Sequence, residues 1–156
     1  MTLNIRQVNP QGTRTFMGTI SADADIHTAL VEAAEKLDVS TATFNLLGGI
    51  REVEFRAFDF DSQQRKAPLY FKRALEIVAG HGTIALLDGK PLVHLHLAVA
   101  YQDEKAPNGI AVLAGHAARA TAFAVEFTLH AYDGDPVHRT MDEATGLMLW
   151  NLPPLG

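Results

Sequence analysis

The hydrophobic positions of the chain follow two different periods, and the first indicates a helix. Between residues 26 and 37, apolar side chains recur at intervals of three and four residues, which places them on one stripe of a helix. The members of this stripe are Ile26, Ala29, Leu30, Ala33, Ala34 and Leu37. The polar segment 21–25 supplies N-cap candidates. His27 lies off the stripe, so we expect it to be solvated.

Most of the remaining chain has the pattern of β-strands. Runs of β-branched and aromatic residues, separated by Gly, Pro and Asp, predict at least six strands. They fall within 14–20, 41–47, 50–58, 74–79, 83–87, 93–101, 110–113 and 123–132. Asp88-Gly89 is typical of a hairpin turn, residues 80–82 of a bulge or turn, and 59–68 of a polar loop.

These elements predict an α+β fold. We expect a single compact domain with a largely antiparallel mixed sheet, one main amphipathic helix and a few short helices. Residues 1–13 are predicted to form an N-terminal arm or strand, and residues 14–156 the domain itself. A chain of 156 residues without repeats fits one domain with a real core.

Composition narrows the class of protein. The apolar fraction of 47% and the charged fraction of 20% are ordinary for a globular domain. Cysteine is absent, which excludes disulfides and thiolate metal ligands. No apolar run approaches the ~18 residues of a membrane span, and the first residues do not resemble a signal peptide. We therefore expect a cytoplasmic protein without a membrane partner.

Three histidines are the strongest chemical signal. His94 and His96 stand two apart in a strand, so both point to one face while Val93 and Leu95 point to the other. His116 follows a glycine just after the next predicted strand, 110–113, and a hairpin would bring it beside the pair. Three neutral imidazoles can bind one metal ion and leave a coordination position open. Zn²⁺ suits imidazole best, with Ni²⁺ and Fe²⁺ as alternatives.

Other side chains are candidates for the same site. His81, between Gly80 and Gly82, and Arg119 are candidates for lining a cavity beside the metal. Glu126 stands among alanines on one face of its strand. It either faces solvent, pairs with an arginine, or points to the metal as a candidate catalytic base. Phosphate-binding glycine loops, nucleophile elbows and nucleophilic cysteines are absent from the sequence.

Several ordered motifs together carry a family resemblance. They comprise Gly18-Thr-Ile20 with 23–26, 43–50, 75–80, Val93-His-Leu-His-Leu97, Gly115-His116, Val125-Glu-Phe127, and Arg139 with Thr145-Gly-Leu147. The set resembles the plants-and-prokaryotes-conserved (PPC) domain, a family labelled "DNA-binding protein with PD1-like motif".

The resemblance implies a compact α+β domain that forms a homotrimer. In some prokaryotic members the three motif histidines, here His94, His96 and His116, bind zinc. Plant relatives add AT-hooks that bind DNA. This chain has no Arg-Gly-Arg-Pro hook, has Ala114 where the family usually has glycine, and has His81 where asparagine is common.

Three functions follow as hypotheses. The first is a trimeric PPC-domain protein with a three-histidine metal site that takes a small-molecule ligand, its activity unassigned. The second is a DNA-associated or transcription-regulatory protein, as the family label implies. The third is a metal-dependent, hydrolase-like enzyme in which Glu126 acts as the base.

The charge balance predicts that the protein does not bind duplex DNA tightly. Thirteen basic residues are outnumbered by eighteen acidic ones, giving −5 per chain and, at three times that, about −15 per trimer. DNA affinity depends on basic side chains that neutralise phosphates. Fluorescence anisotropy with a labelled duplex at near-physiological salt should show no submicromolar binding. Salt-sensitive binding in that range would contradict this prediction and would point first to Arg65, Lys66, Lys72 and Arg73.

Overall fold

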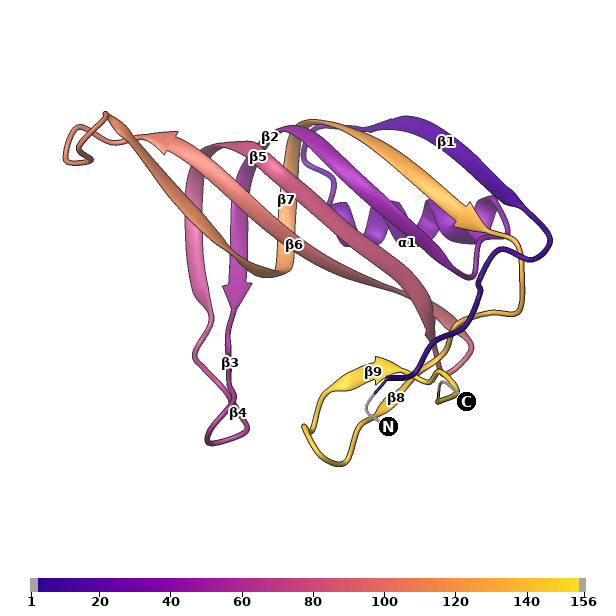
Figure 1. The fold of residues 1–156 in the computed structure, drawn as a ribbon. Helices are drawn as coiled ribbons and strands as arrows, with labels where there is room; N and C mark the ends of the chain where they lie inside the picture. Colours follow the sequence, from indigo (N-terminus) through magenta and orange to yellow (C-terminus); the bar gives the residue numbers. More distant parts are fainter. Residues whose placement is uncertain (1–2, 155–156) are drawn as a thin grey trace.

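Five antiparallel strands in the order β1-β7-β2-β5-β6 form the main sheet of the computed structural model, which describes residues 3–154 (Figure 1). Two small two-stranded sheets, β3-β4 and β8-β9, complete the described part of the chain. The elements are β1 Thr13–Ile20, α1 Ile26–Lys36, β2 Ala42–Arg56, β3 Phe58–Asp59, β4 Gln64–Arg65, β5 Leu69–Leu87, β6 Lys90–Gln102, β7 Ile110–Tyr132, β8 Arg139–Met141 and β9 Met148–Trp150.

The main sheet closes on itself through β7. This strand has 23 residues. Its first part, up to Ala117, pairs with β6, and from His116 onward it pairs with β2 and then also with β1. Because β2, β5 and β6 are neighbours as well, these three strands and β7 form a closed ring of hydrogen-bonded pairs. The ring surrounds a core that includes Leu95, Leu97, Val99 and Ala120.

Helix α1 follows directly from its sequence signals. The side chain of Asp25 caps it, accepting a hydrogen bond from the Thr28 backbone N–H at 2.9 Å. Ile26, Leu30 and Ala34 are fully buried, which confirms the predicted stripe. The helix lies beneath the sheet in Figure 1 and contacts β6 and β7. With 11 residues it is too short to cross a membrane, and residues 3–154 contain no other helix.

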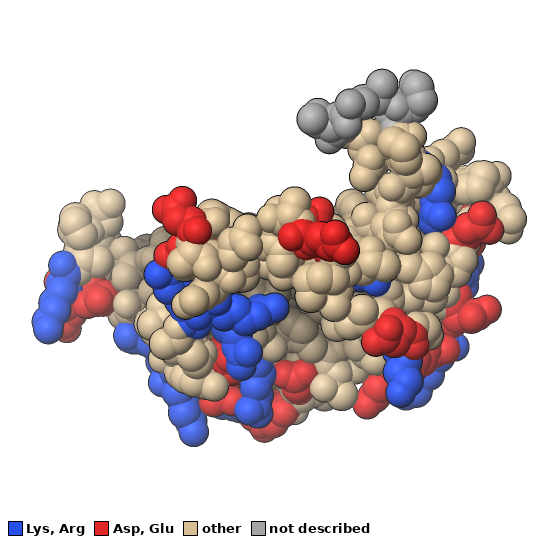
Figure 2. All heavy atoms as spheres, turned by 90° about the horizontal axis from the view of Figure 1, so that it is seen from below, with Lys and Arg blue, Asp and Glu red and all other residues tan. Residues whose placement is uncertain are grey.

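The two short hairpins extend from one side of the sheet (Figure 1). Hairpin β3-β4 follows β2, and hairpin β8-β9 lies close to the C-terminus of the described chain. Their turns are joined by a hydrogen bond of 2.9 Å from Gln63 Nε2 to the Ala144 carbonyl oxygen. Viewed from this side, Lys and Arg side chains gather on one part of the surface (Figure 2).

The single compact domain with a mostly antiparallel sheet and one helix is confirmed, but the expected few short helices are not found in residues 3–154. The polar segment 59–68, expected as a loop, contains the β3-β4 hairpin. Residues 80–82, expected as a bulge or turn, lie inside β5. Glycine is needed at position 82 for close packing, because a Cβ there would lie 2.3 Å from the His94 carbonyl oxygen.

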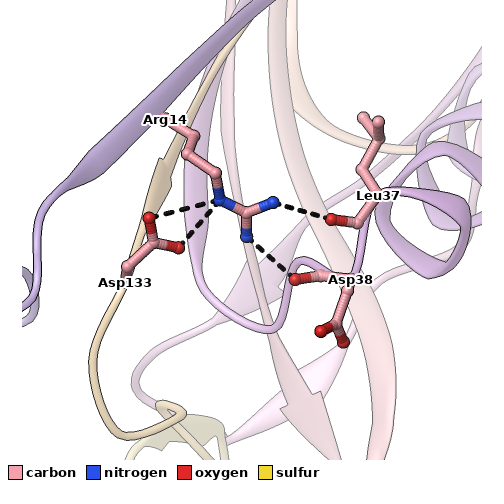
Figure 3. A network of polar contacts seen from close by, with 4 residues as sticks. All are labelled: Arg14, Leu37, Asp38 and Asp133. Atoms are coloured by element: carbon pink, nitrogen blue, oxygen red, sulfur yellow. Dashed lines mark hydrogen bonds and ion pairs between the residues drawn. The ribbon is translucent and has the colours of Figure 1, made fainter.

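Arg14 joins three elements at the other end of the sheet (Figure 3). From β1, its Nε lies 3.0 Å from Asp133 Oδ1, just after β7. Its two terminal nitrogens donate to the carbonyl oxygens of Leu37 and Asp38, at 2.8 and 3.0 Å, where α1 ends. A cation at this end also complements the helix dipole. The guanidinium therefore holds the C-terminal end of α1 against β1 and the end of β7.

Replacing Arg14 tests this role. Arg14→Ala should lower the free energy of unfolding by about 1–3 kcal/mol, because it removes several hydrogen bonds from a charged donor. The measurement is urea denaturation followed by circular dichroism. Lys36→Ala, which removes an exposed ion pair with Glu32, is the control and should cost at most about 1 kcal/mol. Equal effects of the two substitutions would contradict the assigned role.

Candidate metal centre

Three histidines from two adjacent strands meet on one face of the ring. His94 and His96 come from β6 and His116 from β7, and the register of these strands places His96 directly opposite His116. Each imidazole offers one nitrogen, and these three atoms lie within 4.8 Å of one another. The Nε2 atoms of His94 and His96 are 3.2 Å apart. Two nitrogens that share a tetrahedral zinc ion are about 3.3 Å apart, so this spacing fits a common metal.

The alternation of β6 explains why the imidazoles point the same way. Leu95 and Leu97 are 0% and 2% exposed and anchor the opposite face in the core. His94 is half-buried and His96 is exposed on the other face. On β7, Ala117 is fully buried, which leaves the preceding His116 on the same side as the other two histidines. A slip of one residue in either strand would separate the group.

The surroundings keep the three rings neutral. Burial, together with the charge of Arg139 and the neighbouring imidazoles, lowers the pKa of His94 to about 4. Burial also lowers the pKa of His96, with a smaller effect of His81, and the pKa of His116, with smaller effects of nearby imidazoles and arginines. At neutral pH each ring therefore has an unprotonated nitrogen, which a metal ion requires.

Arg139 is the nearest charged side chain to His94. It is 8% exposed. Its Nη2 donates to Thr83 Oγ1 at 3.0 Å and lies 3.4 Å from His94 Nδ1, while Nη1 donates to the Met148 carbonyl oxygen at 3.0 Å. Burial lowers its pKa, but a guanidinium stays charged in proteins. The strand β8 thus delivers a buried positive charge to the edge of the triad.

The sequence profile of the Plants and Prokaryotes Conserved (PCC) domain, the family also written PPC, matches residues 7–133. The chain belongs to this family. The resemblance carried by the motifs is therefore confirmed. No curated protein sequence matches the chain.

Solved structures share the fold of this PCC domain. A metal-containing protein from Archaeoglobus fulgidus is 24% identical, with a TM-score of 0.81 over 96% of this chain and 99% of that one. A plant- and prokaryote-conserved protein from Pyrococcus horikoshii is 24% identical, with a TM-score of 0.78 over 91% and 94%. A protein from Bacteroides thetaiotaomicron, named as a DNA-binding candidate, is 23% identical, with a TM-score of 0.77 over 88% and 92%.

Of the two cavity candidates, only His81 lies beside the triad. The register pairs it with His96, and the two rings stack with their centroids 6.2 Å apart. Arg119 instead lies beside Glu52, 3.9 Å away, and lines a separate shallow recess of about 100 Å³. It does not take part in the histidine group.

The candidate catalytic residue Glu126 is not brought to the triad. It lies ten residues beyond His116 along β7, is exposed, and stands opposite Thr19 and Leu47. No described carboxylate forms an ion pair with any of the three histidines. Within residues 3–154, the three histidines therefore lie together without a carboxylate in ion-pairing distance.

Two residues near the triad, His27 and Arg139, lie where the sequence did not predict them. His27 was expected to be solvated, but its Nε2 donates to the Ala117 carbonyl oxygen at 3.0 Å and its Nδ1 is buried with no partner in residues 3–154. The sequence places Arg139 in a family motif and does not predict that it lies beside His94. Its distance of 45 residues from His94 along the chain gave no signal of their contact.

Proposed function

We propose that this PCC-domain protein binds one divalent metal ion, zinc in preference to nickel or iron, through His94, His96 and His116. The observation that carries the proposal is the convergence of three neutral imidazole nitrogens within 4.8 Å. Three such ligands leave a fourth position for water or a small molecule. The metal-containing protein from Archaeoglobus fulgidus, which shares the fold, supports it.

The residues of the chain define what the site can do. The two strands hold the imidazoles in place, and the leucines behind them limit their movement. When bound, a zinc ion supplies a Lewis acid that can polarise a ligand oxygen. Hydrolysis would also need a proton acceptor near that ligand, and Glu126 stands elsewhere on β7. Metal and ligand binding, rather than hydrolysis, is therefore the function that the geometry supports best.

Loss of a single histidine should abolish tight metal binding. His94→Ala, His96→Ala and His116→Ala should each weaken zinc binding by at least about 100-fold, because even residues that only support metal ligands contribute 10–100-fold. The measurement is zinc stoichiometry and affinity by isothermal titration calorimetry. The expected value for the unmodified protein is one ion per chain.

His130→Ala is the matched control for these substitutions. This imidazole lies on β7 and contacts Thr15 Oγ1 at 3.1 Å, outside the triad. The His130→Ala variant should bind zinc with the same stoichiometry and affinity as the unmodified protein. A protein that takes up no zinc, or that loses it equally on replacement of His130, would refute the proposed site.

We also propose that copies of the chain assemble as a homotrimer, the state that the family resemblance implies. Four neighbouring strands carry exposed apolar side chains, and one from each is considered for the contact between copies. These side chains are Met17, Leu47, Val78 and Phe123, and we call them the apolar patch. Met17 and Leu47 are 84% and 62% exposed. Large exposed apolar side chains on neighbouring strands are typical of a surface that pairs with another protein, and a second copy of this chain is the partner we assign to it.

A charge in the apolar patch should disrupt the assembly. Leu47→Glu should shift the protein from a trimer to a monomer at micromolar concentration, because the carboxylate would lose its hydration in the contact. Phe60→Glu is the control, since Phe60 is 82% exposed at the β3-β4 turn, outside the patch. Multi-angle light scattering measures the mass. A monomeric unmodified protein, or a Leu47→Glu protein that stays trimeric, would contradict the proposal.

A further inference from the structure

The charged side chain next to His94 is positive, and no negative charge is paired with it among the described residues. Three neutral imidazoles leave the charge of a bound divalent ion uncompensated. The buried guanidinium of Arg139 adds a positive charge and forms no ion pair within residues 3–154. Its Nε is buried and has no hydrogen-bond partner there. A buried charge without a counter-charge is costly, and an anion bound beside Arg139 would offset that cost.

Metal binding would also change what Arg139 can contact. Nη2 of Arg139 faces Nδ1 of His94, whereas Nε2 of His94 faces His96. While Arg139 donates to Nδ1, that ring has its hydrogen on Nε2. When Nε2 binds an ion, the hydrogen must move to Nδ1. Arg139 and His94 then present two donors to each other, and both need an acceptor.

Further positive charge borders the other side of the triad. Arg56 stands directly opposite His116 across β2 and β7, although Glu54 already pairs with it. Arg65, on the β3-β4 hairpin, pairs with Phe58, two residues beyond Arg56, and forms no ion pair among the described residues. The surface that carries these hairpins is the one on which Lys and Arg side chains gather in Figure 2.

We propose that the histidine triad and Arg139 together bind a small oxyanion, with a carboxylate or phosphate group, that has at least two negatively charged oxygens. One oxygen would occupy the open position of the metal, and another would accept hydrogen bonds from the Arg139 guanidinium, whose planar fork suits such groups. The inference rests on the proposed metal site and specifies the chemistry of its ligand.

The test uses the full chain loaded with cobalt(II), whose visible spectrum reports changes at the metal. Malonate and inorganic phosphate, added separately, should each change the spectrum in a saturable way, and the tighter of the two identifies the preferred group. Arg139→Gln should weaken both anions by at least about tenfold. Chloride, which can occupy the metal position but has no second oxygen for Arg139, should be weakened by Arg139→Gln much less than either oxyanion, because it loses only the long-range attraction of the charge.

Two controls separate this role from a structural one. Lys105→Gln removes a positive charge from the loop between β6 and β7 and should change the anion affinities by less than about twofold. In buffer without oxyanions, Arg139→Gln should bind cobalt as tightly as the unmodified protein, or more tightly, because a repelling charge has been removed. If Arg139→Gln does not fold, Arg139→Lys, which keeps the charge but lacks the fork, replaces it and should weaken both anions several-fold.

The outcomes distinguish this inference from the proposed function. If cobalt and zinc do not bind to the unmodified protein, the metal site fails and the oxyanion site fails with it. If the metal binds but neither malonate nor phosphate changes the spectrum, only the oxyanion site is overturned. The same conclusion follows if the Arg139 variant that folds binds both anions as tightly as the unmodified protein.

Discussion

The pairing of β6 with the first part of β7 is the constraint on which the rest of the structure depends. It closes the ring of strands around the core and sets His96 opposite His116. Because side chains alternate along a strand, the same register that buries Leu95 and Leu97 exposes the histidines on the other face. The register of β6 and β7 therefore sets both the packing of the core and the positions of the histidines. A change of register would expose the core leucines and separate the histidines.

The hairpins complete the site from outside the ring. Strand β8 supplies Arg139, and β2 ends at Arg56 beside His116 before the chain turns into β3. The hydrogen bond between Gln63 and Ala144 links the two hairpins to each other. The ring thus holds rigid, neutral ligands, while the hairpins contribute charge. In the proposed metal site, changes in the hairpins could alter which ligand is bound without moving the three histidines.

Features that depend on neighbouring residues in the sequence could be predicted from the sequence pattern. The stripe of α1, the β5-β6 hairpin at Asp88-Gly89 and the shared face of His94 and His96 followed from periodicity and turn chemistry. Contacts between distant segments could not be predicted in this way. Arg139 meets His94 only because β8 lies beside β5 and β6 in the fold. Phe123 is exposed because the β2-β7 register shifts next to it, which breaks the simple alternation of buried and exposed positions along β7. Gly82 suggested a turn, although it serves the close approach of β5 to β6.

The central claim is that three imidazole nitrogens bind one metal ion on this PCC domain. X-ray absorption spectroscopy on the zinc-loaded protein tests it most directly, since it reports the ligand types and their distances. The account predicts three imidazole nitrogens at about 2.0–2.1 Å with one further light ligand. A zinc environment dominated by carboxylate oxygens and water, with fewer than three imidazoles, would contradict it.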